Sequence, residues 1–450
     1  MQQLTKLLTS INHPILNGLL GAAFAVILVS CGGSSTPTYT IGGTVSGLTS
    51  GSLVLKNNNG DDLTINANST SFTFATALAS GATYAVTAGT RPSRLACDIT
   101  NNTGAISSAK VTNITIACIT PVYVTNYSSN TVSMYAMDAS TGILTALTTP
   151  TVATGTQPYA IAVNPAGTFA YVTNQGGNTV SMYAINTSTG ILTALTTPTV
   201  ATYFPFSIAV NPAGTFAYVA NASGNTVSMY AIDATTGILT ALTTPTVALS
   251  SSPISIAINP AGTFAYSANH GIGTVSMFAI NATTGLLTAL STPTVTTERI
   301  PNSMVINSGG TFAFVANFGS GTVSMYAINA ATGILTPLTT PTIVAGTQPY
   351  AIAVNPAGTF AYVANYGSGT VSMYAINATT GMLTALATPT VATGNSPTSI
   401  TVNPAGTFAY VTNDGNIVSM YAIEATTGIL TALTTPTVAT GNSPRSIAFK

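Results

Sequence analysis

The stretch NPAGTFAYVTNQGGNTVSMYAINTSTGILT, residues 164–193, recurs in similar copies along most of the chain. Each copy contains a YVTN-like tetrad that opens with an aromatic residue, and successive copies are 47 or 48 residues apart. The seven opening residues are Tyr123, Tyr171, Tyr218, Tyr266, Phe314, Tyr362 and Tyr410. A repeat of this length indicates a repeat architecture, a class that includes the β-propellers.

Each copy predicts four β-strands. In the second copy we expect strands over 159–163, 169–173, 179–185 and 191–200. An Asn-Pro-Ala-Gly turn at 164–167 joins the first two strands, because proline presets φ and glycine closes the turn. Four strands per repeat predict that each copy is one blade of a propeller.

The two ends of the repeat region predict how the ring closes. The first copy begins at its second strand, over 122–126, and lacks an inner strand of its own. The last residues, Ser446-Ile447-Ala448-Phe449, match the inner strand of the other copies. We therefore expect an all-β fold in which residues 119–450 form a seven-bladed β-propeller and the C-terminal strand completes blade one. A solenoid would need capping repeats, which the sequence does not contain.

Residues 38–118 predict a small Ig-like β-sandwich, because short alternating segments are broken by Gly and Asn. This region contains Cys97 and Cys118. An even pair of cysteines in an exported chain predicts a disulfide between them.

The first thirty residues predict an export signal that is not part of the fold. An apolar run over 15–29 follows Lys6 and is too short to be a comfortable transmembrane helix. The run ends in Leu28-Val29-Ser30-Cys31, which resembles a bacterial lipobox. We predict that residues 1–30 are a lipoprotein signal peptide and that Cys31 carries a membrane anchor. The alternative is an ordinary cleaved signal followed by a stray cysteine.

A linker of Gly, Ser, Thr and Pro is expected over 31–37. Gly32 follows the cysteine. In the sorted lipoproteins that this segment resembles, an Asp at this position favours retention in the inner membrane. The resemblance therefore implies an outer-membrane or cell-surface location.

Composition excludes several function classes. Charged residues make up 4% of the chain, with eight basic and eight acidic residues, so no basic patch for nucleic acid is expected. His270 is the one histidine left after signal removal, and scattered single carboxylates do not make a metal site with it. The repeats also lack a G-x-S-x-G nucleophile elbow. We predict neither a metal nor a cofactor.

The recurring motifs Asn-Pro-Ala-Gly-Thr-Phe-Ala-Tyr-Val-Thr-Asn (164–174) and Thr-Val-Ser-Met-Tyr-Ala-Ile (179–185) resemble those of the bacterial YVTN-type and seven-bladed lactonase propellers. The resemblance covers residues 119–450. It implies the propeller fold and a lactone hydrolase activity for some members, for example on 6-phosphogluconolactone. The repeat motif itself is scaffold, so the resemblance does not place a catalytic residue.

Two positions differ among the otherwise similar copies. The first follows the proline that enters each inner strand: Tyr159, Phe206, Ile254, Asn302, Tyr350, Thr398 and Arg445. The second follows the YVTN asparagine: Tyr127, Gln175, Ala222, His270, Phe318, Tyr366 and Asp414. We call these the first and second mouth columns, because both are expected at the same face of the propeller.

The mouth columns predict a nearly neutral, aromatic ligand site, which suits sugars and other flat ligands. The predicted ligand-binding residues are Tyr127, Tyr159, Phe206, Phe318, Tyr350, Tyr366, Asp414 and Arg445. The alternative is that loop positions vary because nothing constrains them.

One grouping could perform acid–base chemistry. His270, Glu298 and Arg299 are expected together between blades four and five, where they could activate water and stabilise an anion. Glu298 and Arg299 could instead pair with each other or face solvent. Arg299 and Arg445 are the basic residues expected at the mouth. Two basic residues are few for binding the phosphate group of a phosphosugar.

Two functions follow from these observations. The first is a membrane-anchored platform that binds a glycan, a small molecule or a protein at the propeller mouth. The alternative is a lactonase-type hydrolase that uses His270 and Glu298.

Overall fold

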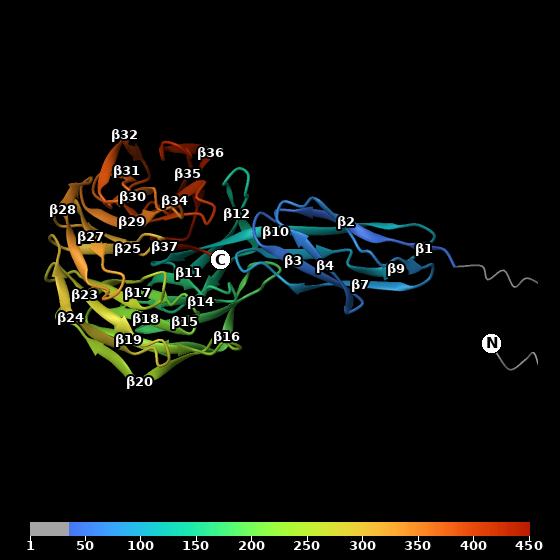
Figure 1. Cartoon of the computed structure of the whole chain (residues 1–450), viewed down its shortest axis with the longest axis horizontal. Coiled ribbons are helices and arrows are strands. Elements are labelled where there is room, and N and C mark those ends of the chain that lie inside the picture. The colour runs from blue at the N-terminus through green and yellow to red at the C-terminus, as the bar shows by residue number, and fades with distance from the viewer. Residues whose placement is uncertain (1–35) are drawn as a thin grey trace, which may run out of the picture. The chain divides into compact units, whose positions relative to one another are not determined.

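The repeat region forms seven blades of β-strands arranged in a ring (Figure 1). Their inner strands line a central channel. The computed structural model describes residues 36–450, and these residues contain strands but no helix. Six blades are separate four-stranded antiparallel sheets, and the seventh is part of a larger sheet. The all-β, seven-bladed propeller predicted from the repeats is confirmed.

The blade strands fall into four sets from the channel to the rim. The innermost are β37 (Pro444–Phe449), β13 (Pro158–Val163), β17 (Pro205–Val210), β21 (Pro253–Ile258), β25 (Pro301–Ile306), β29 (Pro349–Val354) and β33 (Pro397–Val402). The second are β10 (Val111–Asn126), β14 (Phe169–Asn174), β18 (Phe216–Asn221), β22 (Phe264–Asn269), β26 (Phe312–Asn317), β30 (Phe360–Asn365) and β34 (Phe408–Asn413). The third are β11 (Thr131–Met137), β15 (Thr179–Ile185), β19 (Thr226–Ile232), β23 (Thr274–Ile280), β27 (Thr322–Ile328), β31 (Thr370–Ile376) and β35 (Ile417–Ile423). The outermost are β12 (Leu144–Ala153), β16 (Leu192–Ala201), β20 (Leu239–Ala248), β24 (Leu287–Thr296), β28 (Leu335–Val344), β32 (Leu383–Ala392) and β36 (Leu430–Ala439).

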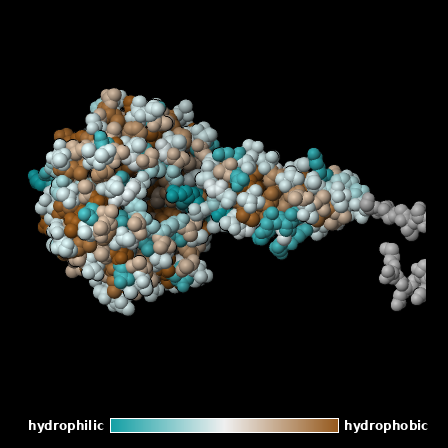
Figure 2. All heavy atoms as spheres, viewed as in Figure 1, coloured by the Kyte–Doolittle hydropathy of each residue, from teal (hydrophilic) through white to brown (hydrophobic). Residues whose placement is uncertain are grey.

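Blade one is closed by the C-terminal strand, as predicted. β37 pairs antiparallel with β10, and Ile447 lies opposite Val124 while Ala448 lies opposite Tyr123. The inner strands of successive blades contact one another around the whole ring, including β33 with β37 and β37 with β13. Closure leaves no blade without an inner strand, and the space-filling view shows a hollow at the centre of the ring (Figure 2).

Buried polar contacts join each blade to the next. The hydroxyl of Tyr171 in blade two donates to the Gly237 carbonyl in blade three at 2.9 Å. The Leu239 amide donates to the sulfur of Met182 at 3.2 Å. Both Tyr171 and Met182 are fully buried, so these contacts pair polar groups that would otherwise be costly to bury.

The strands before the propeller form two sheets around one core. One sheet contains β4 (Gly60–Asn66), β3 (Ser52–Asn57), β7 (Thr83–Thr90) and β9 (Thr103–Ala105). The other places β8 (Ala96–Thr100), β2 (Ile41–Ser46) and β5 (Ser71–Thr73) with the first half of β10, and β1 (Thr38–Tyr39) pairs with β6 (Leu78–Ala79). Leu55 and Val86 of the first sheet and Ile41 and Ile114 of the second belong to the same buried cluster. A relation to immunoglobulin domains stays a prediction.

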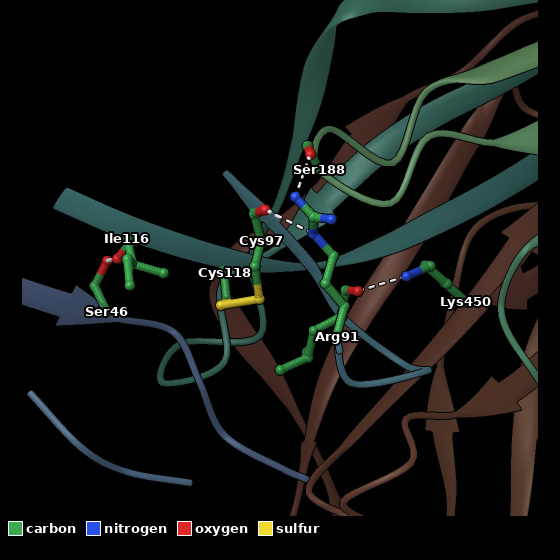
Figure 3. Close-up of a disulfide and its surroundings, with 8 residues drawn as sticks. Ser46, Arg91, Cys97, Ile116, Cys118, Ser188 and Lys450 are labelled. Atoms are coloured by element: carbon green, nitrogen blue, oxygen red, sulfur yellow. Dashed lines mark hydrogen bonds between the residues drawn. A yellow bond between two sulfur atoms is a disulfide. The ribbon is translucent and has the colours of Figure 1, made fainter. Parts of the chain in front are cut away.

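β10 continues from this region into blade one, so the boundary expected after residue 118 falls inside a single strand. The predicted disulfide is present: Cys97 and Cys118 are direct partners on β8 and β10, with their Cα atoms 4.0 Å apart. Figure 3 shows the disulfide beside Arg91, which donates to the Ser188 hydroxyl at 3.0 Å. Lys450 donates from its side chain to the Leu95 carbonyl nearby.

The predicted signal peptide (1–30) and the proposed anchor Cys31 lie outside the described residues, as does the linker up to residue 35. Within residues 36–450, no helix is long and apolar enough to cross a membrane.

Candidate functional site

The two mouth columns lie side by side at one end of the channel. The proline that opens each inner strand pairs with the asparagine that ends the second strand, as Pro158 does with Asn174. The amide of the next residue then donates across the loop: His270 to the Ser252 carbonyl at 2.9 Å, and Phe318 to the Ile300 carbonyl at 2.8 Å. Every blade therefore presents two variable side chains at the same face, as the sequence predicted.

Aromatic side chains from opposite blades meet at this face. Tyr159 of blade two packs on Phe206 with ring centroids 4.6 Å apart, and Tyr350 of blade six packs on Tyr366 at 5.6 Å. The two hydroxyls of Tyr159 and Tyr350 are hydrogen-bonded to each other across the channel. Burial raises the pKa of both phenols, so both stay protonated at neutral pH.

The outer aromatic residues complete the layer. Tyr127 lies edge-on to Tyr159 at 6.3 Å, and Phe318 lies edge-on to Tyr350 at 6.1 Å. The Tyr127 hydroxyl donates to Gln175 Oε1 at 2.9 Å, which fixes that ring. The six aromatic residues predicted at the mouth thus lie in two groups that the Tyr159–Tyr350 contact joins.

A cavity of about 370 Å³ opens on one side of the Tyr159–Tyr350 pair. Its lining comes from both mouth columns and the loops beside them: Tyr159, Phe204, Phe206, Ala222, Ser223, Ser252, Ile254, His270, Asn302, Phe318 and Tyr350. The His270 side chain is partly buried, and burial lowers its pKa below the usual value of 6.5. The imidazole is therefore neutral near pH 7 and able to accept a proton.

Asn302 contributes the amide of this cavity. One Nδ2 hydrogen is donated to the Tyr350 carbonyl at 2.8 Å, which orients the side chain. Because an amide nitrogen carries two hydrogens, a second donor remains for a ligand. Asn302 was recognised in the first mouth column, but nothing in the sequence marked it as a partner of His270.

Glu298 and Arg299 are placed differently from His270. Both are exposed, and they line a neighbouring surface pocket of about 490 Å³ in which His270 forms one wall. Neither lines the cavity beside Tyr159 and Tyr350. The structure therefore brings the three predicted catalytic residues to one loop region. Of the three, His270 alone lines the cavity beside Tyr159 and Tyr350.

Across the channel, Arg445 of blade one and Asp414 of blade seven form an ion pair. Arg445 Nη1 lies 3.3 Å from Asp414 Oδ1, and the guanidinium carbon lies 5.3 Å from the centre of the Tyr127 ring. The Tyr366 hydroxyl donates to Asp414 Oδ2 at 3.2 Å. The ion pair and its two tyrosines all belong to the predicted ligand-binding set.

Deeper in the channel, a cavity of about 140 Å³ is lined by all seven inner strands. The residue after the first mouth column is Ser207, Ser255, Ser303, Ser399 or Ser446 in five blades, and Ala160 or Ala351 in the other two. Four of the five serine hydroxyls accept an amide hydrogen of the next blade, as Ser255 does from Met304 at 3.1 Å. We did not predict this column, yet the sequence contains a signal for it, because alanine occurs only after the two tyrosines that meet across the channel.

Among residues 36–450, no group of three or more His, Cys, Asp or Glu side chains is arranged to hold a metal ion.

Comparison with known proteins places this geometry in context. The model of the family "Lactonase, 7-bladed beta-propeller" matches residues 118–254, 243–348 and 338–449. No curated protein matches the sequence significantly.

Three solved structures share the fold. A candidate 6-phosphogluconolactonase from Bacteroides fragilis NCTC 9343 is 21% identical with a TM-score of 0.65, covering 74% of this chain and 98% of that one. A second from Bacteroides uniformis ATCC 8492 is 21% identical with a TM-score of 0.66, covering 74% and 99%. The periplasmic gluconolactonase of Pseudomonas aeruginosa is 20% identical with a TM-score of 0.63, covering 74% and 99%. At such identities the likeness concerns the fold alone.

Proposed function

The chain belongs to the lactonase family of seven-bladed β-propellers, and on that premise we propose that it hydrolyses a lactone in the cavity beside His270. The observation that carries the proposal is the position of a neutral imidazole in a cavity that it shares with Asn302, Tyr159 and Tyr350. This arrangement joins a proton acceptor to hydrogen-bond donors, which is what lactone opening requires.

His270 acts as the general base in this proposal. It accepts a proton from a water molecule as the water oxygen bonds to the lactone carbonyl carbon. The ring C–O bond then breaks, and the imidazolium returns the proton to the departing alkoxide. The product is the open hydroxy acid, and no other reactant is needed.

The carbonyl oxygen gains negative charge during the attack and needs donors. The second Nδ2 hydrogen of Asn302 is one, since the first is held by the Tyr350 carbonyl. A phenol is the other, because in the Tyr159–Tyr350 hydrogen bond one of the two hydroxyl hydrogens stays free. The raised pKa of both phenols keeps that hydrogen in place.

The test is acid release by the purified full-length protein on a panel of uncharged aldonolactones, with the spontaneous rate subtracted. His270→Gln is expected to lower kcat/KM by about 10²–10⁴-fold, the usual contribution of a general base. Glu298→Gln is the matched control, because Glu298 is exposed and lines only the outer pocket.

Three outcomes decide between the alternatives. Loss of turnover in His270→Gln alone supports the proposal. Equal loss in Glu298→Gln would favour the His270–Glu298 pair predicted from the sequence. Absence of turnover on every lactone would reject hydrolysis.

A binding platform without turnover is the second candidate, and the aromatic layer favours it. Ring pairs such as Tyr159–Phe206 at 4.6 Å present apolar faces beside hydroxyl groups, which suits a glycan or another flat ligand. Glycan-array binding that is lost in Tyr350→Ala, together with no lactone turnover, would establish this function in place of hydrolysis.

We also propose that the protein is exported and attached to a membrane through Cys31. The support is the lipobox-like sequence Leu28-Val29-Ser30-Cys31. Attachment by several acyl chains at one cysteine gives a stable anchor. Mass spectrometry of the mature N-terminal peptide is expected to find the lipid, and Cys31→Ser is expected to leave the protein unlipidated. An unmodified Cys31 in the membrane fraction would contradict the anchor.

A further inference from the structure

Arg445 is the charged residue among those that line the deep channel, and its guanidinium forms an ion pair with a carboxylate through Nη1. Its Nη1 lies 3.3 Å from Asp414 Oδ1 and 3.5 Å from Oδ2. The side chains of Arg445 and Asp414 are 19% and 23% exposed. A pair so far removed from water is screened less by solvent and salt than a surface pair.

Neighbouring side chains hold this pair in place. The Tyr366 hydroxyl donates to Asp414 Oδ2 at 3.2 Å, and the Tyr127 ring faces the guanidinium at 5.3 Å. Tyr127 is itself fixed by Gln175 at 2.9 Å. The contacts come from four different blades, so the ion pair is a feature of the assembled ring.

An arginine guanidinium is well matched to carboxylate and phosphate groups, which it binds with paired hydrogen bonds. A ligand anion at Arg445 must displace Asp414 or lie next to its negative charge. Either way, the carboxylate opposes binding of the anion. An uncharged ligand meets no such opposition.

We propose that Asp414 is a specificity residue that excludes anions from the channel mouth, so that the site takes uncharged lactones and not phosphorylated ones. For the substrate class, this inference rests on the proposed lactone hydrolysis. Hydrolysis converts an uncharged lactone into a carboxylate, so the same residue favours release of the product.

Arg299 is the other basic residue near the mouth, and it is a second group to which an anion could bind. It is exposed and lines the outer pocket with Glu298. Any anion binding that depends on Arg299 would take place outside the channel and would leave Asp414 without a role.

The experiment is calorimetric titration of the purified full-length protein with gluconate, 6-phosphogluconate and inorganic phosphate at low ionic strength. Asp414→Asn keeps an oxygen that can accept the Tyr366 hydrogen bond while it removes the charge. We expect Asp414→Asn to bind the two sugar acids at least tenfold more tightly than the wild type. Asp414→Gln places in blade seven the residue that blade two has at this position, Gln175, and serves if the first variant does not fold.

The double variant Asp414→Asn with Arg445→Met is the control. It is expected to lose the gained affinity, because the guanidinium would be the group that binds the anion. Equal anion affinity in the wild type and in both Asp414 variants would overturn the proposal. So would affinity in the wild type that Arg299→Met abolishes.

These titrations need no turnover, so they separate the two proposals. If no lactone is hydrolysed but Asp414→Asn gains anion affinity through Arg445, anion exclusion stands and hydrolysis fails. If uncharged lactones are hydrolysed and Asp414→Asn neither binds the acids more tightly nor shows stronger product inhibition, hydrolysis stands and the role of Asp414 fails.

Discussion

The blade interfaces and the channel mouth are built from the same repeats, but they differ in how strictly they repeat. At the interfaces, the contact between Tyr171 and the Gly237 carbonyl recurs at 2.7 Å between Tyr266 and the Gly333 carbonyl. At the mouth, the second mouth column contains six different residue types in the seven blades.

Burial explains the difference. The interface residues are almost fully buried, and close packing penalises a change of even one methylene group. Ten of the fourteen mouth side chains line a cavity, where a change of side chain can be accommodated without rebuilding the packed blade interfaces. Stability therefore depends on the repeated positions and specificity on the unrepeated ones.

The largest expected effect comes from a repeated position. Met182→Ala removes a fully buried side chain whose sulfur accepts the Leu239 amide at 3.2 Å. Substitutions of this kind create a cavity and lower the free energy of unfolding by about 2–5 kcal/mol. Chemical denaturation measures the change. Tyr203→Ala, at a mouth loop where the side chain is 58% exposed, is the control and is expected to change stability by less than about 0.5 kcal/mol. Equal effects would mean that the mouth loop contributes as much to stability as the blade interface.

The disulfide adds stability in a region that has no repeats. Cys97 and Cys118 are 21 residues apart, and closing a loop of this size contributes about 3 kcal/mol by restricting the unfolded chain. The double variant Cys97→Ser and Cys118→Ser is expected to lose about this amount in chemical denaturation. Wild-type protein unfolded in the presence of a reductant should match the variant. Unchanged stability would mean that the strand pairing of β8 with β10 suffices alone.

The repeated part of the fold could be predicted from the sequence because local rules act there. Asn-Pro-Ala-Gly turns set the first hairpin in five of the blades, and the lone inner strand Ser446–Phe449 had one vacant place to fill. The sequence listed Asp414 and Arg445 separately among the mouth residues, and their ion pair became evident only in the structure.

The cavity of about 370 Å³ beside Tyr159 and Tyr350 could not be predicted in detail. Its central contact joins Tyr159 to Tyr350, which lie on opposite sides of the ring, and the reach of two side chains depends on the channel width. The loop that carries Glu298 and Arg299 turns through Ile300, whose φ of 56° is unusual for a branched residue. Both charged side chains are exposed, which is the alternative that the sequence had left open for them.

A smaller effect tests the interface hydrogen bonds without disturbing packing. Tyr171→Phe leaves the Gly237 carbonyl buried without its donor, and we expect a loss of about 1 kcal/mol. The chain offers a natural counterpart, because Phe314 occupies this position in blade five. Phe314→Tyr is expected to gain up to about 1 kcal/mol by donating to the Gly381 carbonyl of blade six. Thermal and chemical denaturation of the two variants and the wild type measure both changes. If Tyr171→Phe loses no stability and Phe314→Tyr gains none, the tyrosine hydroxyl contributes nothing to stability.

The smallest expected effect lies at the mouth and depends on pH. Burial lowers the pKa of His270 below 6.5, so the unfolded chain binds a proton more readily than the folded one. The contribution of His270 to stability is therefore present above pH 6.5 and is lost as the pH falls through the folded pKa. Asp138 and Glu424, with pKa values near 2, do not titrate in this range. Melting temperatures between pH 5 and 7.5 should show a slightly steeper decline in the wild type than in His270→Gln. In the wild type, kcat/KM for lactone hydrolysis should also fall as the pH falls through the pKa of His270, because the protonated imidazole cannot act as a base. Identical pH profiles for the two proteins would mean that His270 is solvated and does not belong to the cavity.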